Sequence, residues 1–146
     1  MTKTAHEAIQ VGALSVRFHV DADESYGSVT VFECEVPANA RMPAPHSHDD
    51  FDETVFGLDG VITFTVGGER IDVSSGEALF IPRRVIHGFT NDGDVDARML
   101  AVISPGLLGS RYFEDIAEVL AGDGPPNIER IGDVMRRHGL TPAPPA

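Results

Sequence analysis

The sequence predicts an all-β fold, an antiparallel double sheet over residues 1–104, with a helical extension over residues 105–146 that belongs to the same domain. Short runs of β-branched and aromatic residues fill the first part and are separated by glycine-containing turns. No segment between these runs has the period of a helix, which appears only after Pro105-Gly106. Strands that follow one another without helical crossovers pair antiparallel, so two packed sheets are expected.

Residues 11–20 and 28–36 are the first two predicted strands. In the second, apolar residues alternate with acidic ones, which indicates one buried and one solvated face. Cys34 lies on the apolar side, where we expect a small buried side chain rather than a reactive thiol. The acidic segment 21–27 between the strands is expected to be a solvated loop.

Two dipeptides predict tight hairpin turns farther along the chain. Asp59-Gly60 and Gly67-Gly68 each separate two β-type runs, and glycine suits the positive φ angles of two-residue hairpin loops. The remaining strands are therefore expected at residues 54–56, 61–66, 69–73, 78–81, 87–90 and 97–103.

Two short helices are predicted at the C-terminal end. Ser110 is the candidate N-cap of the first and Gly122 its stop, whereas the second begins at Asn127 and ends before Gly139. Helices this short are expected to pack on the barrel or on a second subunit. The tail 141–146 is expected to lie extended with nothing to bury. The apolar stripes of the two helices consist of Phe113, Ile116, Ala117 and Leu120, and of Ile128, Ile131, Val134 and Met135.

Composition restricts the possible partners. The net charge of −12 predicts that nucleic acid and anionic membranes are repelled. The single cysteine excludes an internal disulfide and suits a reducing compartment. The first residues lack the apolar run of a signal peptide, and no stretch is long enough to cross a bilayer. We therefore expect a cytoplasmic protein that acts on a small molecule.

Four residues form a candidate metal site. His46 and His48 point to the same side of an extended strand, and Glu53 is near enough to join them after one bend. His87 follows a short strand that begins after a glycine turn and ends at Pro82. Imidazole and carboxylate bind iron, manganese, nickel, copper or zinc, so one divalent ion with open coordination positions is expected. The other histidines, His6, His19 and His138, are expected to be surface or hydrogen-bonded residues.

The spacing of these residues resembles the two motifs of the cupin superfamily. His46-Ser47-His48, four residues, Glu53, six residues and Gly60 resembles the first motif. Gly76, five residues, Pro82, four residues, His87, three residues and Asn91 resembles the second. The resemblance implies a double-stranded β-helix, also called a jelly roll or cupin barrel, with the four residues as metal ligands. Ala40 and Arg84 stand where these motifs usually have glycine, and a positive φ at either would be strained.

Pocket walls are expected on the strands that carry the ligands. Alternation from Glu53 turns Val55 inward, and alternation from His87 turns Phe89 inward. An apolar wall around one ion suits a small aromatic or enolic molecule. Arg83 and Arg84 either hold an anion at the rim or lie exposed in a turn. Further wall candidates are Met42, Phe32 and Phe51.

The layout over residues 28–140 resembles small bacterial cupins grouped with quercetin dioxygenases. The function that we favour is a metal-dependent oxidoreductase of dioxygenase type, in which Glu53 also acts as a catalytic base. A non-catalytic, metal-dependent binder of a small metabolite is the alternative. Sugar isomerase or epimerase chemistry is a further one, although it needs a basic pocket. A homodimer is expected, because the edge strand at residues 11–20 has to be covered.

Overall fold

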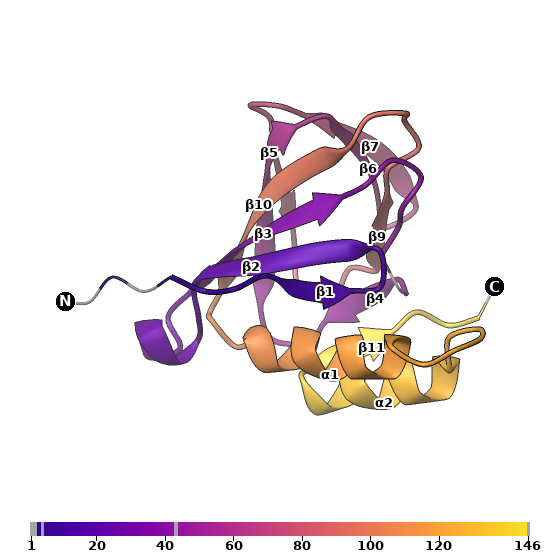
Figure 1. Ribbon diagram of the computed structural model, residues 1–146. Coiled ribbons are helices and arrows are strands. Elements are labelled where there is room, and N and C mark those ends of the chain that lie inside the picture. Colours follow the sequence, from indigo (N-terminus) through magenta and orange to yellow (C-terminus); the bar gives the residue numbers. More distant parts are fainter. Residues whose placement is uncertain (1–2, 4, 43, 146) are drawn as a thin grey trace.

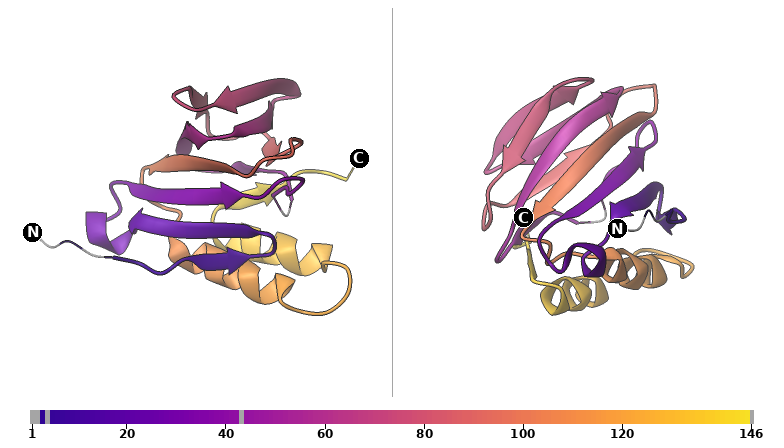
Figure 2. Two further views of the ribbon diagram at one scale, coloured as in Figure 1. Left: turned by 45° about the horizontal axis from the view of Figure 1, so that its top comes forward. Right: turned by 90° about the vertical axis from the view of Figure 1, so that its left-hand side faces the viewer.

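The computed structural model describes residues 3, 5–42 and 44–145 of the chain. The first residues of the chain, Met1, Thr2 and Thr4, and the last residue of the predicted tail, Ala146, lie outside the described residues. Two antiparallel sheets face each other, and two helices lie together at one end of them (Figures 1 and 2).

Within the described residues the larger sheet has six strands and the smaller has five. Every strand pair is antiparallel, so the predicted double sheet is confirmed as a double-stranded β-helix. In spatial order the larger sheet consists of β1 (Ile9–Val11), β2 (Leu14–Val20), β3 (Thr30–Val36), β10 (Ala97–Ser104), β5 (Asp52–Asp59) and β8 (Ala78–Ile81). The smaller consists of β11 (Leu140–Pro142), β4 (His46–His48), β9 (His87–Thr90), β6 (Val61–Val66) and β7 (Glu69–Ser74).

Glycine forms the predicted hairpin turns. Gly60, between β5 and β6, has a φ of 66°, and a side chain there would place its Cβ 2.7 Å from the carbonyl oxygen of Asp96. Gly67 and Gly68, between β6 and β7, have φ angles of 56° and 84°. Both turns therefore use backbone conformations that side chains disfavour.

The N-terminal strand differs from its prediction. Gly12 has a φ of 60° and divides the predicted strand 11–20 into a hairpin of β1 and β2. The edge of the larger sheet is consequently β1, and β2 is paired on both sides, with β1 and with β3. A short 3-10 helix (Asp23–Ser25) lies in the predicted acidic loop.

The first predicted helix is present as α1 (Ser110–Leu120). Gly109, rather than Ser110, occupies the N-cap position, and the backbone N–H of Ser110 donates to a side-chain oxygen of Asp21. This contact lies 89 residues away in sequence, so a local pattern could not reveal it.

The second predicted helix is α2 (Ile128–Arg137). Asn127, where this helix was predicted to begin, is its N-cap, because its side chain accepts a hydrogen bond of 3.1 Å from the N–H of Arg130. One residue of the predicted apolar stripe is misplaced: Ile128 is 69% exposed, since the first turn of α2 extends beyond the barrel surface. Neither helix in the described part of the chain is long and apolar enough to cross a membrane.

The predicted tail 141–146 is extended at its start, but that start is paired with another strand rather than free. Residues 140–142 form β11, which pairs with β4, and Leu140 is only 1% exposed. The turn at Gly139, with a φ of 81°, returns the chain from α2 to the barrel. The C-terminus thus becomes the edge strand next to the strand that carries two histidines.

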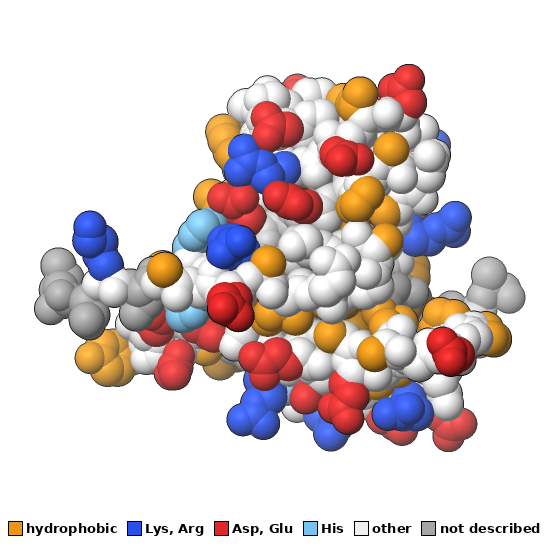
Figure 3. Space-filling view, in the orientation of Figure 1, with side chains coloured by type: hydrophobic (Ala, Val, Ile, Leu, Met, Phe, Trp, Pro, Cys, Tyr) orange, Lys and Arg blue, Asp and Glu red, His pale blue; other side chains and the backbone are white. Residues whose placement is uncertain are grey.

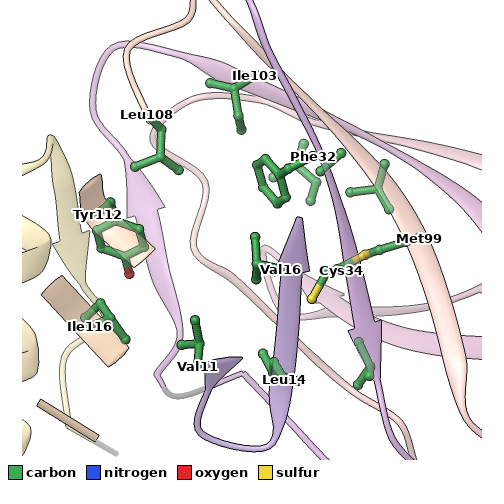
Figure 4. Packing of buried hydrophobic residues seen from close by; sticks show 14 of the residues in the cluster. Val11, Leu14, Val16, Phe32, Cys34, Met99, Ile103, Leu108, Tyr112 and Ile116 are labelled. Carbon is green, nitrogen blue, oxygen red and sulfur yellow. The ribbon is translucent and has the colours of Figure 1, made fainter. Parts of the chain in front are cut away.

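The hydrophobic core fills the space between the sheets and continues under the helices (Figure 4). Phe18 and Phe32 from the larger sheet lie 5.7 Å and 5.1 Å from Phe113 of α1, measured between ring centroids. Cys34 points inward as predicted. Hydrophobic side chains gather along the line where the β1–β2 hairpin meets the helices (Figure 3). This helical layer closes one end of the barrel, where the candidate site lies.

Candidate metal centre

Three imidazoles meet on two neighbouring strands of the smaller sheet. His46 and His48 lie on one face of β4 because side chains alternate along a strand. His87 begins β9 and is paired with His46 in the antiparallel register. Its ring centroid lies 5.0 Å from that of His46 and 4.6 Å from that of His48. All three side chains are buried, and their potential ligand atoms lie within 4.8 Å of one another.

Backbone carbonyl groups orient two of these rings. The Nδ1 atoms of His46 and His87 lie 3.0 Å from the carbonyl oxygens of Ala44 and Val85. A proton on Nδ1 satisfies each contact and leaves the lone pair of Nε2 free. In metal sites, such a contact between Nδ1 and a carbonyl oxygen fixes the tautomer of an imidazole whose Nε2 binds the ion.

The third ring, His48, is held by packing and through its backbone. It stacks on Phe51, with 4.6 Å between ring centroids. Its carbonyl oxygen accepts a hydrogen bond of 2.7 Å from the backbone N–H of Arg84, and its strand pairs with β11 at Leu140. Its Nδ1 is buried without a hydrogen-bond partner among the described residues. An unpaired buried nitrogen costs stability, and coordination through Nε2, the atom that faces Glu53, would stabilise this ring without pairing Nδ1.

Burial keeps the three imidazoles neutral. It lowers the pKa of His46 to about 3, with a further contribution from the charge of His87. It lowers the pKa of His48 to about 2, with contributions from the other two rings. The pKa of His87 is lowered by burial as well. Neutral imidazole is the form that binds metal, so the site is already in the protonation state that coordination needs.

Glu53 on β5 extends toward the imidazoles from the opposite sheet. Its Oε1 lies 3.8 Å from the Nε2 atoms of both His48 and His87. It falls outside the tightest group of ligand atoms, which the three histidines form alone. Burial raises the pKa of Glu53 to about 7. The structure therefore places a carboxyl group beside the imidazoles that can gain or lose a proton near neutral pH.

The donor set fits a divalent transition-metal ion. Bonds from such ions to imidazole nitrogen are about 2.0–2.1 Å long, so two ligand atoms on one ion are at most about 4.2 Å apart. The three histidines come close to that spacing before any adjustment. They would hold the ion, with Glu53 as the candidate fourth ligand. Cys34 lines the same cavity but is not part of this group of ligand atoms, so the described donor set contains no thiolate.

The imidazoles and Glu53 border a cavity of about 70 Å³. Phe89, Met42 and Phe32, which the sequence suggested as wall residues, line this cavity. Two other suggested residues do not. Val55, two residues after Glu53 on the same strand, is fully buried in the core. Phe51 packs against the face of the His48 ring instead.

Much of the wall comes from segments that the sequence did not connect with the site. The β1–β2 hairpin, α1 and α2 together supply a large apolar portion of it. The apolar stripes of the helices were the available signal, but a stripe does not tell which part of a barrel it covers. The residues contributed by these segments are Val11, Leu14, Val16, Leu108, Tyr112, Phe113, Ile116 and Met135.

Arg83 and Arg84 are not among the wall residues of the cavity. Arg83 donates hydrogen bonds to Asp52, and these bonds lower the pKa of that carboxyl and raise the pKa of the guanidinium. Arg84 has a φ of 68°, the positive value expected where the motif usually has glycine. Ala40 is the other residue that stands where a motif usually has glycine. There the positive φ, 66°, belongs to the preceding residue, Asn39.

Comparisons with known proteins agree with this geometry. The fold is a double-stranded β-helix whose three buried histidines could hold a metal ion. Residues 32–103 match the model of the cupin domain, and the chain belongs to the cupin superfamily.

Two curated relatives are similar over part of their length. The chain is 30% identical to quercetin 2,3-dioxygenase of Bacillus subtilis over 96 residues, which cover 66% of this chain and 28% of that protein. It is 35% identical to the tetracenomycin polyketide synthase protein TcmJ of Streptomyces glaucescens over 60 residues, 41% of this chain and 40% of that protein. The chain thus spans less than half the length of these relatives.

Among solved structures, the polyketide cyclase RemF of Streptomyces resistomycificus is similar at 27% identity. Its TM-score is 0.59, and the match covers 71% of this chain and 77% of RemF. KdgF of a Halomonas species matches with a TM-score of 0.60 at 19% identity over 68% of this chain and 88% of that one, a likeness of fold alone.

Proposed function

We propose that this chain is a metal-dependent oxidoreductase of dioxygenase type that acts on a compact, largely apolar enolic or aromatic substrate. The observation that carries this proposal is the convergence of three buried neutral imidazoles and Glu53 on one cavity with a largely apolar wall. Similarity to quercetin 2,3-dioxygenase over 96 residues supports it.

A divalent ion in this site would polarise a chelated enolate, and a redox-active one would also permit reaction with dioxygen. The chain's own residues provide the surroundings. The Nδ1 contacts of His46 and His87 leave their Nε2 atoms free for an ion, the Nε2 atoms of His48 and His87 face Glu53, and the rest of the wall is largely apolar. Glu53, with a pKa of about 7, accepts the proton that an enolic or phenolic substrate loses on binding.

The cavity size restricts the substrate class. Pockets for drug-sized ligands have volumes of about 300–1,000 Å³, whereas this cavity measures about 70 Å³. A compact substrate therefore fits better than a flavonol, which would need the helical layer to move. No lysine or arginine lies among the described wall residues, so the cavity offers no cation for the phosphate of a sugar phosphate, and sugar isomerase chemistry is disfavoured.

The test begins with metal-free protein loaded separately with iron, manganese, nickel or copper. Oxygen uptake is then followed with a panel of small enolic and aromatic compounds, together with flavonols. We expect uptake with at least one redox metal and a compact substrate, and its loss in His87→Ala. The variant His19→Ala changes an exposed histidine and serves as the matched control. No oxygen uptake with any of these metals would rule out dioxygenase activity.

A second candidate is non-oxidative rearrangement or ring closure of an enolic substrate. The similarity to the polyketide cyclase RemF and to TcmJ favours it. The same cavity would serve, with Glu53 removing and returning a proton. Product formation under strictly anaerobic conditions would support this activity over the dioxygenase. Tight binding without turnover under both conditions would instead indicate a non-catalytic binder.

We also propose a homodimer and a cytoplasmic location. The unpaired edge of β1, rather than the whole predicted strand 11–20, is the surface that a second copy would cover. Light scattering at micromolar concentration that reports a monomer would contradict the dimer. Cell fractionation tests the location.

A further inference from the structure

One hydroxyl group reaches the cavity from outside the region that matches the cupin domain. Tyr112 belongs to α1, beyond the matched residues 32–103, and it lines the same cavity as the imidazoles and Glu53. The other wall residues named above, apart from the candidate ligands, are apolar or carry sulfur. Tyr112 is therefore the single hydroxyl on the described wall.

The side chain of Tyr112 is buried, and its hydroxyl has no hydrogen-bond partner among the described residues. Tyr112 is 5% exposed, and none of the described residues makes a hydrogen bond with its phenol. Buried hydroxyl groups are normally satisfied, because leaving one unpaired costs about 1–3 kcal/mol. Figure 4 shows the ring beside Leu108, with its hydroxyl directed toward Ile116 and Val11, which also line the cavity. Since Tyr112 lines the cavity, an occupant of the cavity, water or ligand, is in a position to supply the partner.

The position of the ring is fixed by its neighbours. Phe113 lies 5.0 Å away in an edge-to-face arrangement, and the ring of His138 lies 5.6 Å away. His138 is itself held by Asp115 at 2.8 Å. A phenol held in this way loses little conformational freedom when a ligand binds, which favours its use in recognition.

The phenol is a hydrogen-bond donor at neutral pH. Burial, and after it the charge of Glu53, raise the pKa of Tyr112 above its usual value, so the hydroxyl remains protonated. Its complementary ligand group is an acceptor oxygen. The cavity thus offers metal-binding nitrogens on one wall and one neutral donor on the wall that α1 supplies.

We propose that Tyr112 binds and orients the substrate by donating a hydrogen bond to an acceptor oxygen at the end remote from the chelated end. This inference rests on the proposed metal-dependent function and adds a substrate property. The substrate is a small molecule with two oxygen functions, a bidentate group for the ion and a separate carbonyl or carboxyl oxygen for Tyr112.

The test uses full-length protein loaded with Zn²⁺ and two small chelating probes. Acetohydroxamate chelates through two oxygens and ends in a methyl group, whereas oxalate chelates through two oxygens and presents two more at its far end. We expect Tyr112→Phe to weaken oxalate binding about fivefold, the effect of one neutral hydrogen bond. Acetohydroxamate binding and zinc content should be unchanged. Tyr26→Phe, the same substitution at a residue that is 97% exposed, is the matched control.

A spectroscopic readout keeps the test independent of how well Tyr112→Phe folds. The chain has two tyrosines and no tryptophan, so Tyr112 is the only tyrosine in the Tyr26→Phe variant. Oxalate binding to zinc-loaded Tyr26→Phe should shift the near-ultraviolet tyrosine band, with the same affinity that calorimetry gives. Acetohydroxamate should leave the band unchanged.

The outcomes separate this inference from the proposed function. Equal effects of Tyr112→Phe on both probes, or saturation with oxalate without a change in the tyrosine band, would overturn the role of Tyr112 alone. Wild-type protein that takes up no zinc, or that takes it up and binds neither probe, would contradict the metal-dependent function itself.

Discussion

Acidification of the metal-free protein should destabilise it through the buried imidazoles. An unfolded histidine takes up a proton near pH 6.5, whereas folded His46 and His48 have pKa values of about 3 and 2. Below about pH 6.5 the unfolded chain therefore binds protons that the folded protein does not. The stability contributed by the neutral rings is fully present above that pH and is lost as the pH falls.

Glu53 acts in the opposite direction. Burial raises its folded pKa to about 7 from its ordinary value of 4.5. Between these values the folded protein holds a proton that the unfolded chain releases, so acidification over this range favours folding. When the pH falls from about 7.5 to 5.5, His46 and His48 together lower the free energy of unfolding by about 3 kcal/mol, and Glu53 raises it by about 2 kcal/mol. Because His87 adds to the cost, the net loss should be at least about 1 kcal/mol.

Urea unfolding followed by circular dichroism, with a chelator present, measures this difference. The variant His48→Gln should lose clearly less stability on acidification than the wild type, since one buried imidazole is gone. His19→Gln, which changes a half-exposed histidine, should behave like the wild type. Unchanged or increased wild-type stability at the lower pH, or identical behaviour of the two variants, would refute the reasoning.

Three further predictions concern single positions. Arg84→Gly should raise the free energy of unfolding by up to about 1 kcal/mol, because glycine relieves the strain of the positive φ. Arg83→Gly should lower the free energy of unfolding. If urea unfolding shows a change of the same sign for both variants, strain at Arg84 is not the cause. Leu140→Ala should lower the free energy of unfolding by about 2–4 kcal/mol because this residue of β11 is buried, whereas Ile128→Ala at an exposed position should change it by no more than about 0.5 kcal/mol. A thermal melt in which both variants match the wild type would disprove the role of β11. Cys34, buried and with a pKa raised to about 12, should react with an aromatic disulfide reagent only after unfolding; rapid labelling of the native protein would contradict its burial.

The parts of the fold that could be predicted depend on neighbours in the sequence. A strand has a period of two, so His46 and His48 were placed on one face without knowledge of any other strand. The turn at Gly60 was readable because only glycine tolerates the positive φ and the close approach of the chain there. The start of the second helix at Asn127 was readable because it also depends on a local contact, since the N–H group that Asn127 caps lies three residues away.

The parts that could not be predicted depend on contacts between distant segments. β11 exists because Gly139 returns the chain to β4, and no local pattern in a proline-rich tail encodes that pairing. Val55, expected on the wall from alternation, is not a wall residue, because alternation gives the face of a sheet and not the position of a cavity along it. Phe51, suggested without that argument, packs on His48 instead. Strain at Arg84 was expected from the sequence, but the hydrogen bond from its backbone N–H to His48 depends on how the segment before β9 meets β4.

The sequence by itself determined the type of chemistry: imidazoles at strand spacing, a carboxylate within a few residues, and turns that force an antiparallel barrel. Those features are local, and local backbone geometry is enough to specify them. Only the tertiary structure decided that the helical extension closes the barrel end, that the cavity is small, and that Tyr112 shares it with the histidines. The physical reason is that an apolar stripe fixes which side of a helix is buried, whereas the surface that it covers is chosen by the packing of the whole chain.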